Sequence, residues 1–283
     1  MNELIINVVV LGLVGAGAGY ASGLFGIGGG AVMVPAMFFV FRSLGVDPTV
    51  VMHCAVATSA AVIIVNSFRS VRTHHARGSV DMALLWPPSR GGRVWGSYAL
   101  WIGAGSFVAA TLIAPHLSSR ALTAVFAVVA LLVAAQFVFG RPGFVLRESV
   151  PGGAGPPVVG GGIGALSAVM GIGGGSLSVP FLTLCGVPVH RAVGTASGFG
   201  LAIAVPATLG FMLSGLGAEG RPVGSVGYVN LIGALMVVAV AWLFVPMGAA
   251  AAHRLDGAVL RRVFGVVLAL VALNMLRVSL AYA

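Results

Sequence analysis

Residues 26–35 read Gly-Ile-Gly-Gly-Gly-Ala-Val-Met-Val-Pro, and residues 171–180 read Gly-Ile-Gly-Gly-Gly-Ser-Leu-Ser-Val-Pro. Both stretches contain the same glycine cluster with a proline five residues after it. Their offset, 171 − 26 = 145, is about half of the 283-residue chain. A pattern that recurs at a fixed offset indicates internal duplication. The sequence therefore predicts two related halves, each built around one glycine cluster.

The duplication extends beyond the glycine clusters. Residues 55–59 (Ala-Val-Ala-Thr-Ser) correspond to residues 192–196 (Ala-Val-Gly-Thr-Ala), and residues 78–80 correspond to residues 224–226, both Gly-Ser-Val. The match runs in the same order through both halves. A tandem duplication explains it better than a chance recurrence of one glycine-rich motif.

The composition is that of a membrane protein. Hydrophobic residues make up 59% of the chain, charged residues make up 7%, and the mean hydropathy is +1.08. A soluble domain carries about 25% charged residues, so this chain has too few to cover a water-facing surface. Apolar stretches of membrane-spanning length recur from end to end. The net charge of +9 comes from arginines in short loops, which favours a topological role over nucleic-acid binding.

The sequence predicts an all-α, polytopic membrane helix bundle. We expect a first transmembrane repeat at 1–140, a Gly- and Pro-rich linker at 141–157, and a second transmembrane repeat at 158–283. Each repeat contains a segment before the glycine cluster, a short segment after it, and three longer spans. The expected segments are 4–25, 31–41, 49–68, 94–115 and 121–139, then 157–170, 176–186, 192–215, 226–250 and 258–280.

The arginines predict that the two repeats are inverted relative to each other. Equivalent loops carry opposite charge bias, and positively charged loops favour the cytoplasmic side. This rule places the arginine-rich loops and the linker in the cytoplasm, and both termini outside. The arginine-rich loops hold Arg69, Arg72, Arg77, Arg90 and Arg93 in the first half and Arg254, Arg261 and Arg262 in the second half. The equivalent arginine-poor loops hold only Arg221 in the second half and Arg120 in the first half.

The glycine clusters predict broken or re-entrant helices. Glycine weakens a helix by about 1 kcal/mol relative to alanine, and a break within lipid persists only where the freed backbone groups face protein, water or a ligand. The helix that follows each break begins with free N–H groups, which can bind an anion. We expect the substrate site at Gly28, Gly29, Gly30, Gly173, Gly174 and Gly175. Close helix crossing is the alternative role for these glycines.

Other polar side chains fall at membrane depth near the clusters. Thr58, Ser59, Thr195 and Ser197 lie in matching spans, and Asn66 lies deep in the first of them. Their hydroxyl and amide groups can donate to an anion. They can also bond to a carbonyl one turn earlier or hold two helices together. We predict that these residues contribute to substrate binding, and we leave the structural roles open.

Titratable residues precede both Thr-bearing motifs. His53 and His190 each lie five residues before the matching threonine, and Arg191 follows His190. They are candidates for gating or for coupling transport to a proton, with placement at the membrane interface as the alternative. The pattern contains no catalytic constellation and no metal-ligand spacing. We therefore expect no enzyme activity, no metal and no cofactor.

These motifs resemble those of the sulfite exporter TauE/SafE family. The resemblance rests on the paired Gly-Ile-Gly-Gly-Gly-x4-Pro segments, on Ala-Val-Gly-Thr-Ala-Ser at 192–197, and on Gly-Ser-Val-Gly-Tyr-Val-Asn at 224–230. It covers essentially the whole chain. It implies a multi-pass permease of the bacterial inner membrane that exports small sulfur-containing anions such as sulfite or organosulfonates.

Three functions follow in order of preference. The first is a secondary transporter of a small anion, with a proton or sodium ion as a coupling partner and rocking of one repeat against the other. The second is a passive anion channel. The third is a membrane-embedded enzyme or assembly factor, which would require catalytic groups at depth. The expected partners are the anion and the lipid bilayer, without nucleic acid; the sequence leaves the oligomeric state open, with a dimer allowed.

Overall fold

The computed structural model describes residues 2–26, 28–85, 96–140 and 145–281. Arg90, Arg93 and Arg141 of the charge pattern lie outside these ranges. The first half contains α1 (Asn2–Phe25), α2 (Gly30–Ser43), α3 (Val51–His75), α4 (Met82–Leu85), α5 (Tyr98–Val108) and α6 (Ser119–Phe139). The second half contains α7 (Gly161–Met170), α8 (Gly175–Leu184), α9 (Val189–Ser214), α10 (Leu231–Ala252) and α11 (Gly257–Ala281).

Shorter elements extend or connect these helices. The π-helical turn η2 (Ala109–Ile113) and the 3₁₀ turn η3 (Ala114–His116) continue α5, and the π-helical turn η4 (Pro156–Gly160) leads into α7. A two-stranded antiparallel hairpin, β1 (Ser225–Val226) and β2 (Val229–Asn230), precedes α10. Asn230 then caps α10, because its side chain accepts a hydrogen bond from the Gly233 amide at 2.8 Å.

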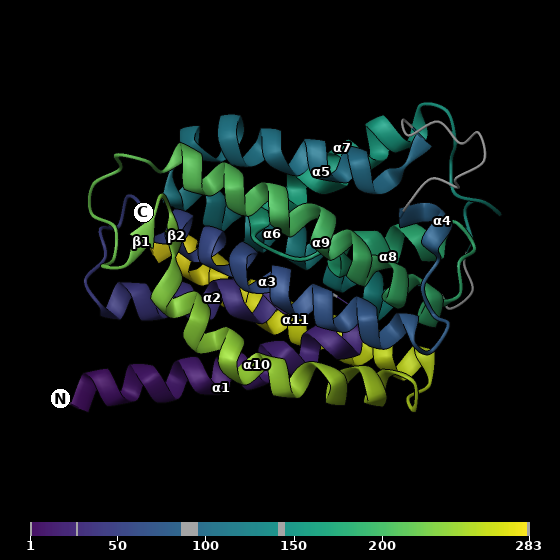
Figure 1. The fold of residues 1–283 in the computed structure, drawn as a ribbon, viewed down its shortest axis with the longest axis horizontal. Helices are drawn as coiled ribbons and strands as arrows, with labels where there is room; N and C mark the ends of the chain where they lie inside the picture. The colour runs from purple at the N-terminus through teal and green to yellow at the C-terminus, as the bar shows by residue number, and fades with distance from the viewer. Residues whose placement is uncertain (1, 27, 86–95, 141–144, 282–283) are drawn as a thin grey trace.

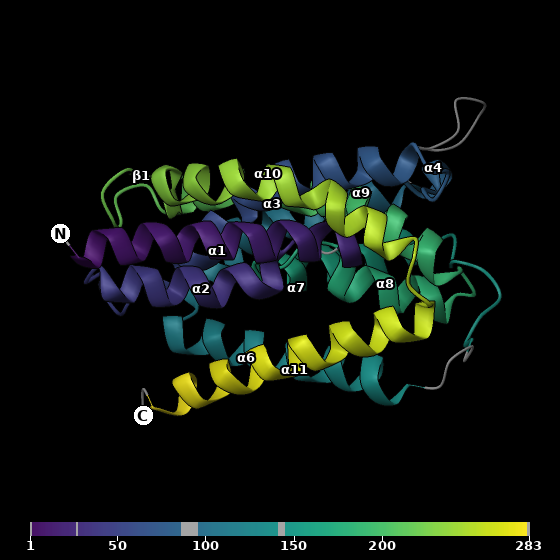
Figure 2. The same ribbon diagram turned by 90° about the horizontal axis from the view of Figure 1, so that it is seen from below.

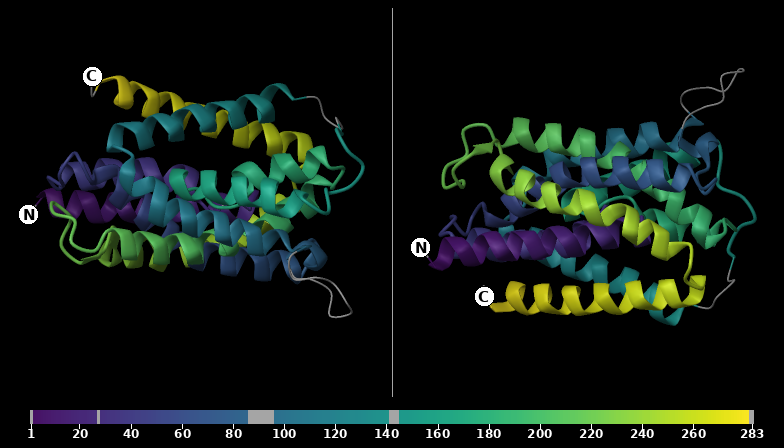
Figure 3. Two further views of the ribbon diagram at one scale, coloured as in Figure 1. Left: turned by 90° about the horizontal axis from the view of Figure 1, so that it is seen from above. Right: turned by 60° about the horizontal axis from the view of Figure 1, so that its bottom comes forward.

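The helices form an elongated bundle whose long axis most of them follow (Figure 1). The central helices α3 and α9 pack against each other, and most of their residues are buried. Helices α6 and α11 pack side by side as a separate layer on one face (Figures 2 and 3). α1 begins and α11 ends at the same end of the bundle (Figure 1).

The prediction of a polytopic all-α membrane bundle is confirmed. Within the described residues, five helical stretches are long and apolar enough to cross a membrane. Several of these helices carry outward-facing leucines: Leu112, Leu132 and Leu243 are each about two-thirds exposed. Lipid tails can solvate such a surface, whereas water cannot. The five stretches are Val51–His75, Tyr98–His116, Ser119–Phe139, Val189–Ser214 and Leu231–Ala252.

The predicted helix breaks are present at both glycine clusters. α1 ends at Phe25 and α2 begins at Gly30; α7 ends at Met170 and α8 begins at Gly175. Two boundaries differ appreciably from the sequence prediction. The span expected to begin at residue 226 begins at Leu231, because the hairpin β1–β2 occupies the residues before it. The span expected to end at residue 68 continues to His75, and Arg69 within it lies over the Trp242 ring at 4.0 Å.

The two halves interlock. Helix α1 packs along α10, α7 packs along α5, and α6 packs along α11, so each of these major contacts joins one half to the other. Helices at equivalent places in the two halves, such as α3 and α9, run in opposite directions along the long axis (Figure 1). Inverted repeats require equivalent helices to run in opposite directions. The inversion of the repeats relative to the membrane stays a prediction from the sequence.

Small residues allow the closest of these contacts. Gly15, Gly19 and Gly23 recur every four residues on α1 and lie directly against the backbone of α10. A Cβ atom at Gly19 would lie 2.7 Å from the Cα of Ala241. Such glycine stripes let membrane helices approach until their backbones touch. Gly164 lies 145 residues after Gly19 in the chain, and it packs in the same way against the backbone of Ile102 on α5.

Candidate functional site

The first helix of each half ends at a glycine that turns the chain. Gly26 has φ +68° and Gly171 has φ +62°, both in the left-handed region where residues with a Cβ are disfavoured. This backbone geometry ends the helices because it points the next peptide away from the helix axis. The same residue type therefore causes the same break at the same place in both halves.

The two breaks meet in the interior of the protein. Gly26 lies against the carbonyl of Val193 on α9, and a Cβ at Gly171 would lie 2.9 Å from the Cα of Val56 on α3. Each break thus packs on the central helix of the other half. Gly30 lies against the carbonyl of Gly171, so the start of α2 touches the other break directly. The two glycine clusters therefore lie in contact with each other.

The helices that follow the breaks begin without side-chain caps. The residues preceding their first turns, Gly29 and Gly174, carry no side chain that could accept the free N–H groups. Gly28, Gly29, Gly30, Gly174 and Gly175 are all buried. Two helix N-termini, each equivalent to roughly half a positive charge, therefore start in the protein interior near each other.

Helix α3 carries the polar side chains that touch both breaks. The Ser59 hydroxyl donates to the Gly171 carbonyl at 2.8 Å, and Asn66 Nδ2 donates to the Gly28 carbonyl at 3.2 Å. Both side chains are fully buried. Asn66 Oδ1 has no hydrogen-bond partner. Because Nδ2 already bonds a carbonyl, Oδ1 is the acceptor that remains free.

Ser67 is a polar residue beside both breaks that the sequence did not single out as a candidate. Its hydroxyl is fully buried and has no partner. It lies 3.1 Å from the position of a Cβ at Gly28, and it lies directly against Gly200 of α9. A Cβ at Gly200 would in turn be 3.7 Å from the amide nitrogen of Gly174. The Ser67 hydroxyl is therefore held between the two glycine clusters with its hydrogen unused.

The threonines have matching roles that join the two halves. Thr58 Oγ1 accepts the backbone N–H of Asn230 at 3.0 Å, and Thr195 Oγ1 accepts the backbone N–H of Asp81 at 2.9 Å. Each hydroxyl from one half thus anchors a loop of the other half. Both side chains are fully buried. Neither bonds to the glycine clusters in the structure.

The remaining predicted binding residues have local partners. Ser197 Oγ donates to the Val193 carbonyl one turn earlier at 3.1 Å, and it lies 2.9 Å from Ser70 Oγ. The Gly173 carbonyl accepts the Ser176 hydroxyl at 3.3 Å. Ser197 therefore shows the back-bonding that the sequence left open.

The candidate gating residues lie at opposite ends of the bundle. His53 is buried, its Nε2 lies 3.1 Å from the Ala114 carbonyl, and its ring stacks on Tyr228 at 5.1 Å. Burial raises the pKa of the Tyr228 phenol, which keeps it neutral. At the other end, Arg191 forms an ion pair with Asp81 at 3.2 Å. His190 is half-buried beside that pair.

A continuous polar stripe leads from the breaks toward the end that holds His190. Ser59, Asn66, Ser70 and His74 recur at spacings of seven, four and four along α3, so they lie on one helical face. All four are buried. Ser70 Oγ contacts both Ser197 Oγ and the Ser22 carbonyl, the latter at 3.3 Å. The stripe connects the glycine clusters with His74 in the last turn of the helix.

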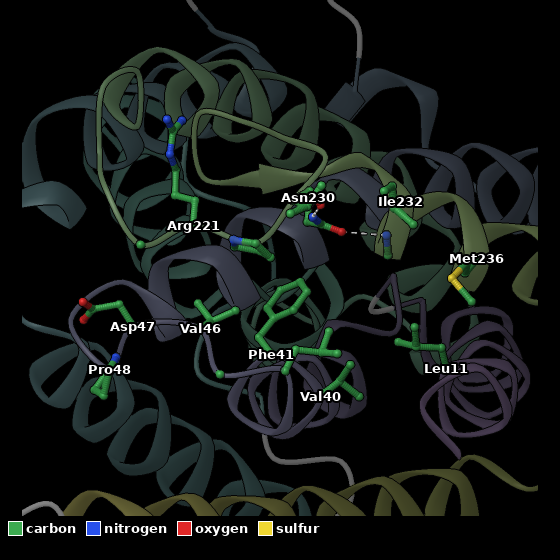
Figure 4. A pocket seen from close by; sticks show the side chains of 16 residues that line it. Leu11, Val40, Phe41, Val46, Asp47, Pro48, Arg221, Asn230, Ile232 and Met236 are labelled. Carbon is green, nitrogen blue, oxygen red and sulfur yellow. Dashed lines mark hydrogen bonds between the residues drawn. The ribbon is translucent and has the colours of Figure 1, made fainter. Parts of the chain in front are cut away.

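A cavity lies between the loops around Asp47 and Arg221 and the helices α2 and α10 (Figure 4). Its volume is about 870 Å³. The cavity is mostly apolar and includes none of the predicted site residues. Hydrogen bonds from Thr49 hold the pKa of the Asp47 carboxyl below its ordinary value, so this edge of the cavity is negatively charged.

In the residues that the structure describes, the side chains that usually bind metal ions do not form a metal site. No group of three or more His, Cys, Asp or Glu side chains within them is placed to hold a metal ion. Cys54 and Cys185 are both free thiols. The side chains that touch the two breaks are hydroxyls and an amide. The chemistry available there is hydrogen bonding from neutral groups and helix N-termini.

Comparison with known proteins gives consistent matches along the chain. The family model described as sulfite exporter TauE/SafE matches residues 11–275. A probable membrane transporter protein of Haemophilus influenzae is 31% identical over 93% of this chain and 96% of its own length. Probable membrane transporter proteins of Methanocaldococcus jannaschii and Bacillus subtilis are 29% and 26% identical over 83% and 96% of this chain, and over 82% and 97% of their own lengths. No solved structure matches the chain significantly.

Proposed function

Because the chain belongs to the sulfite exporter TauE/SafE family of membrane transporters, we propose that it is a secondary transporter of a small sulfur-containing anion, such as sulfite or an organosulfonate. Its place is the bacterial inner membrane, with the linker in the cytoplasm and both ends of the chain in the periplasm. The direction that fits the family is export.

The contact between the two helix breaks is the observation that carries this proposal. The first turns of α2 and α8 present backbone N–H groups that no side chain caps. The Ser67 hydroxyl between them is buried and unpartnered. Anions bind well to such groups, because helix N-termini and hydroxyl donors stabilise negative charge without a fixed cation. A site built from neutral donors can also release its ligand, as a transporter must.

The unpaired acceptor Asn66 Oδ1 favours anions that carry a hydrogen-bond donor of their own. Asn66 Oδ1 is buried beside the first break without a donor. A buried acceptor left unpaired costs about 1–3 kcal/mol, and a bound anion that brings its own hydrogen-bond donor relieves that cost. Hydrogen sulfite carries such a proton, and amino- or hydroxysulfonates carry an ammonium or hydroxyl group. We expect these anions to bind more tightly than sulfate, which offers only acceptors.

The packed centre favours a carrier over an open channel. Gly30 touches the Gly171 carbonyl and the side chain of Ile63, so the two breaks close on each other. An anion can enter this region only if the halves move apart. The interlocked halves would open toward one side at a time, by rocking about the contact between α3 and α9.

Counterflow in proteoliposomes tests the proposal. Vesicles loaded with unlabelled sulfite or organosulfonate should take up the labelled anion faster than empty vesicles, and the rate should saturate. Conductance steps without counterflow would show that the protein is a channel and not a carrier. No saturable movement of sulfite, organosulfonates or thiosulfate under any imposed gradient would overturn the proposed function.

Ser67→Ala tests the site itself. The variant removes a hydroxyl that bonds nothing in the structure, so the fold should be unaffected. Loss of a hydrogen bond to a charged ligand, about 1.5–3 kcal/mol, should weaken anion binding by about tenfold to a hundredfold. Thr73→Val is the matched control, because it removes a hydroxyl on the same helix that bonds only to the Arg69 carbonyl. Equal half-saturation concentrations in both variants would exclude Ser67 from the site.

A further inference from the structure

Two histidines from different halves form a hydrogen-bonded pair at the end of the polar stripe. His74 on α3 is buried, with 1% of its surface exposed, and His253 at the end of α10 is exposed. His74 Nε2 lies 3.0 Å from the Gly23 carbonyl, and His74 Nδ1 lies 3.2 Å from His253 Nε2. Both ring nitrogens of the buried histidine are therefore engaged.

These contacts fix the tautomers of the neutral pair. A carbonyl only accepts, so His74 must donate from Nε2 to Gly23. A neutral imidazole has one N–H, so His74 Nδ1 is an acceptor and His253 donates to it from Nε2. His253 Nδ1 is then the acceptor at the solvent end of the pair. The arrangement is a directed chain from an exposed nitrogen to a buried one.

The groups around the pair are mostly cationic or neutral. The His190 ring at the start of α9 stacks on His253 with 6.1 Å between centroids. Arg77 after α3 acts on both histidines. α1 contributes the Gly23 carbonyl, α9 also carries Arg191 in its ion pair with Asp81, and the turn after α10 carries Arg254 and Asp256. Partial desolvation of its ring lowers the pKa of His253, and Arg77 and His190 lower it further, so His253 is neutral until the solution turns acidic.

The pair is attached to the moving parts of the proposed transport site. Gly23 lies three residues before Gly26, where α1 breaks, and it packs against the backbone of α10. Ser70, one turn before His74, contacts Ser197 of α9. A positive charge on His74 would therefore change the electrostatic potential where α1, α3, α9 and α10 meet, next to the first glycine cluster.

We propose that the His74–His253 pair is the proton-binding site that couples anion movement to proton movement. The inference rests on the proposed transport function and specifies its coupling ion. A proton from solution binds His253 Nδ1, and the proton on His253 Nε2 passes to His74 Nδ1. His253 is neutral again and His74 carries the added charge, still donating to Gly23. That charge offsets the charge of an anion bound between the two helix breaks, and loss of the anion returns the proton along the same chain.

Gradient-driven accumulation of the anion tests the coupling. If one proton moves with each anion, a pH gradient of one unit, which corresponds to about 1.4 kcal/mol, drives about tenfold accumulation. The gradient is imposed in both directions in separate vesicles, with the membrane potential clamped. In His74→Gln the accumulation should disappear, because glutamine can donate to Gly23 but cannot take up a proton. His75→Gln, an exposed neighbour, should accumulate the anion like the unmodified protein.

The outcomes separate this inference from the transport function on which it rests. Saturable counterflow without any effect of the pH gradient would overturn the proton site and leave the transporter intact. Equal accumulation by His74→Gln and the unmodified protein would overturn it too. Absence of both counterflow and conductance would instead overturn the transport function.

A second measurement does not depend on transport. Histidine side-chain chemical shifts in the purified protein, followed by NMR between about pH 3.5 and pH 8 with and without sulfite, report protonation directly. His74 and His253 should titrate as a coupled pair, so His253→Gln should change the His74 titration. A His74 signal that is constant over this range, or that His253→Gln leaves unaltered, would overturn the proposal.

Discussion

Replacing Gly30 with alanine adds one methyl group where the two helix breaks touch. Gly30 is the first residue of α2, and alanine at that place in an isolated helix is favoured over glycine by about 1 kcal/mol. In this protein the added Cβ would meet the backbone of the other half. It would lie against the Gly171 carbonyl and 2.7 Å from the Cα of Ile172.

The size of the perturbation follows from these contacts. Ordinary contact for a Cβ begins at 3.4 Å, so the breaks must separate by at least 3.4 − 2.7 = 0.7 Å, and by more at the closer Gly171 carbonyl. The obstructing atoms belong to the backbone and cannot rotate away. Overpacking of this kind costs about 1–3 kcal/mol, which outweighs the gain in helix propensity. A misplacement of about 1 Å at a reacting or binding group can cost about a hundredfold in rate, so we expect transport to fall by at least about tenfold.

Two assays measure the two effects. Thermal unfolding in detergent, followed by size-exclusion chromatography, should give a lower midpoint for Gly30→Ala. Counterflow in proteoliposomes should give a lower maximal rate at equal protein content. Gly17→Ala is the control, because Gly17 faces outward on α1 with no atom within 4 Å of an added Cβ. That variant should be as stable as the unmodified protein or more stable, with normal transport.

One result would refute the reasoning. If Gly30→Ala unfolds at the same temperature as Gly17→Ala and transports at the normal rate, the breaks tolerate separation. The tight central contact would then have no role in holding the proposed anion site. A loss of stability with normal transport would assign the contact to folding alone.

Three further changes test other parts of the structure. Ser59→Ala leaves the buried carbonyl of Gly171 without its 2.8 Å hydrogen bond, which should cost about 1–3 kcal/mol of stability; an unchanged unfolding midpoint would show that another donor replaces it. Desolvation lowers the pKa of His253 below its ordinary value of 6.5 in the folded protein. The stability that neutral His253 contributes is therefore complete above about pH 6.5 and is lost as the pH falls through the lowered pKa. Unfolding midpoints measured against pH should fall in acid, and His253→Gln should make that fall smaller. Gly19→Val drives a branched side chain into the backbone at Ala241, and it should abolish the monodisperse chromatographic peak; a normal peak would mean that α1 and α10 can separate.

The sequence predicted the architecture because its signals were local. Apolar spans identify membrane helices by length, and a run such as Gly28–Gly30 breaks a helix whatever surrounds it. The largest boundary difference is at Arg69, which lies inside α3 and stacks on Trp242 of a distant segment. Contacts of that kind depend on which helices are neighbours, and the sequence pattern does not contain that information.

The site was predictable in part for the same reason. Ser59 and Asn66 were identified as polar groups at depth, and both contact the breaks. Ser67 and His74 were missed, although a helical-face pattern on α3 links His74 to Ser59 and Asn66. Their significance depends on partners from other segments, Gly200 for Ser67 and His253 for His74. The back-bonding alternative was correct for Ser197.

The interlocking of α1 with α10 and of α5 with α7 has a consequence for how such a chain can arise and assemble. Expressed separately, residues 1–140 would lack the partner for the glycine face of α1, and residues 145–283 would lack the partner for α7. An ancestral gene encoding one such unit could only have worked as an obligate pair of subunits. Co-expression of the two fragments should therefore restore a stable complex that neither fragment forms alone.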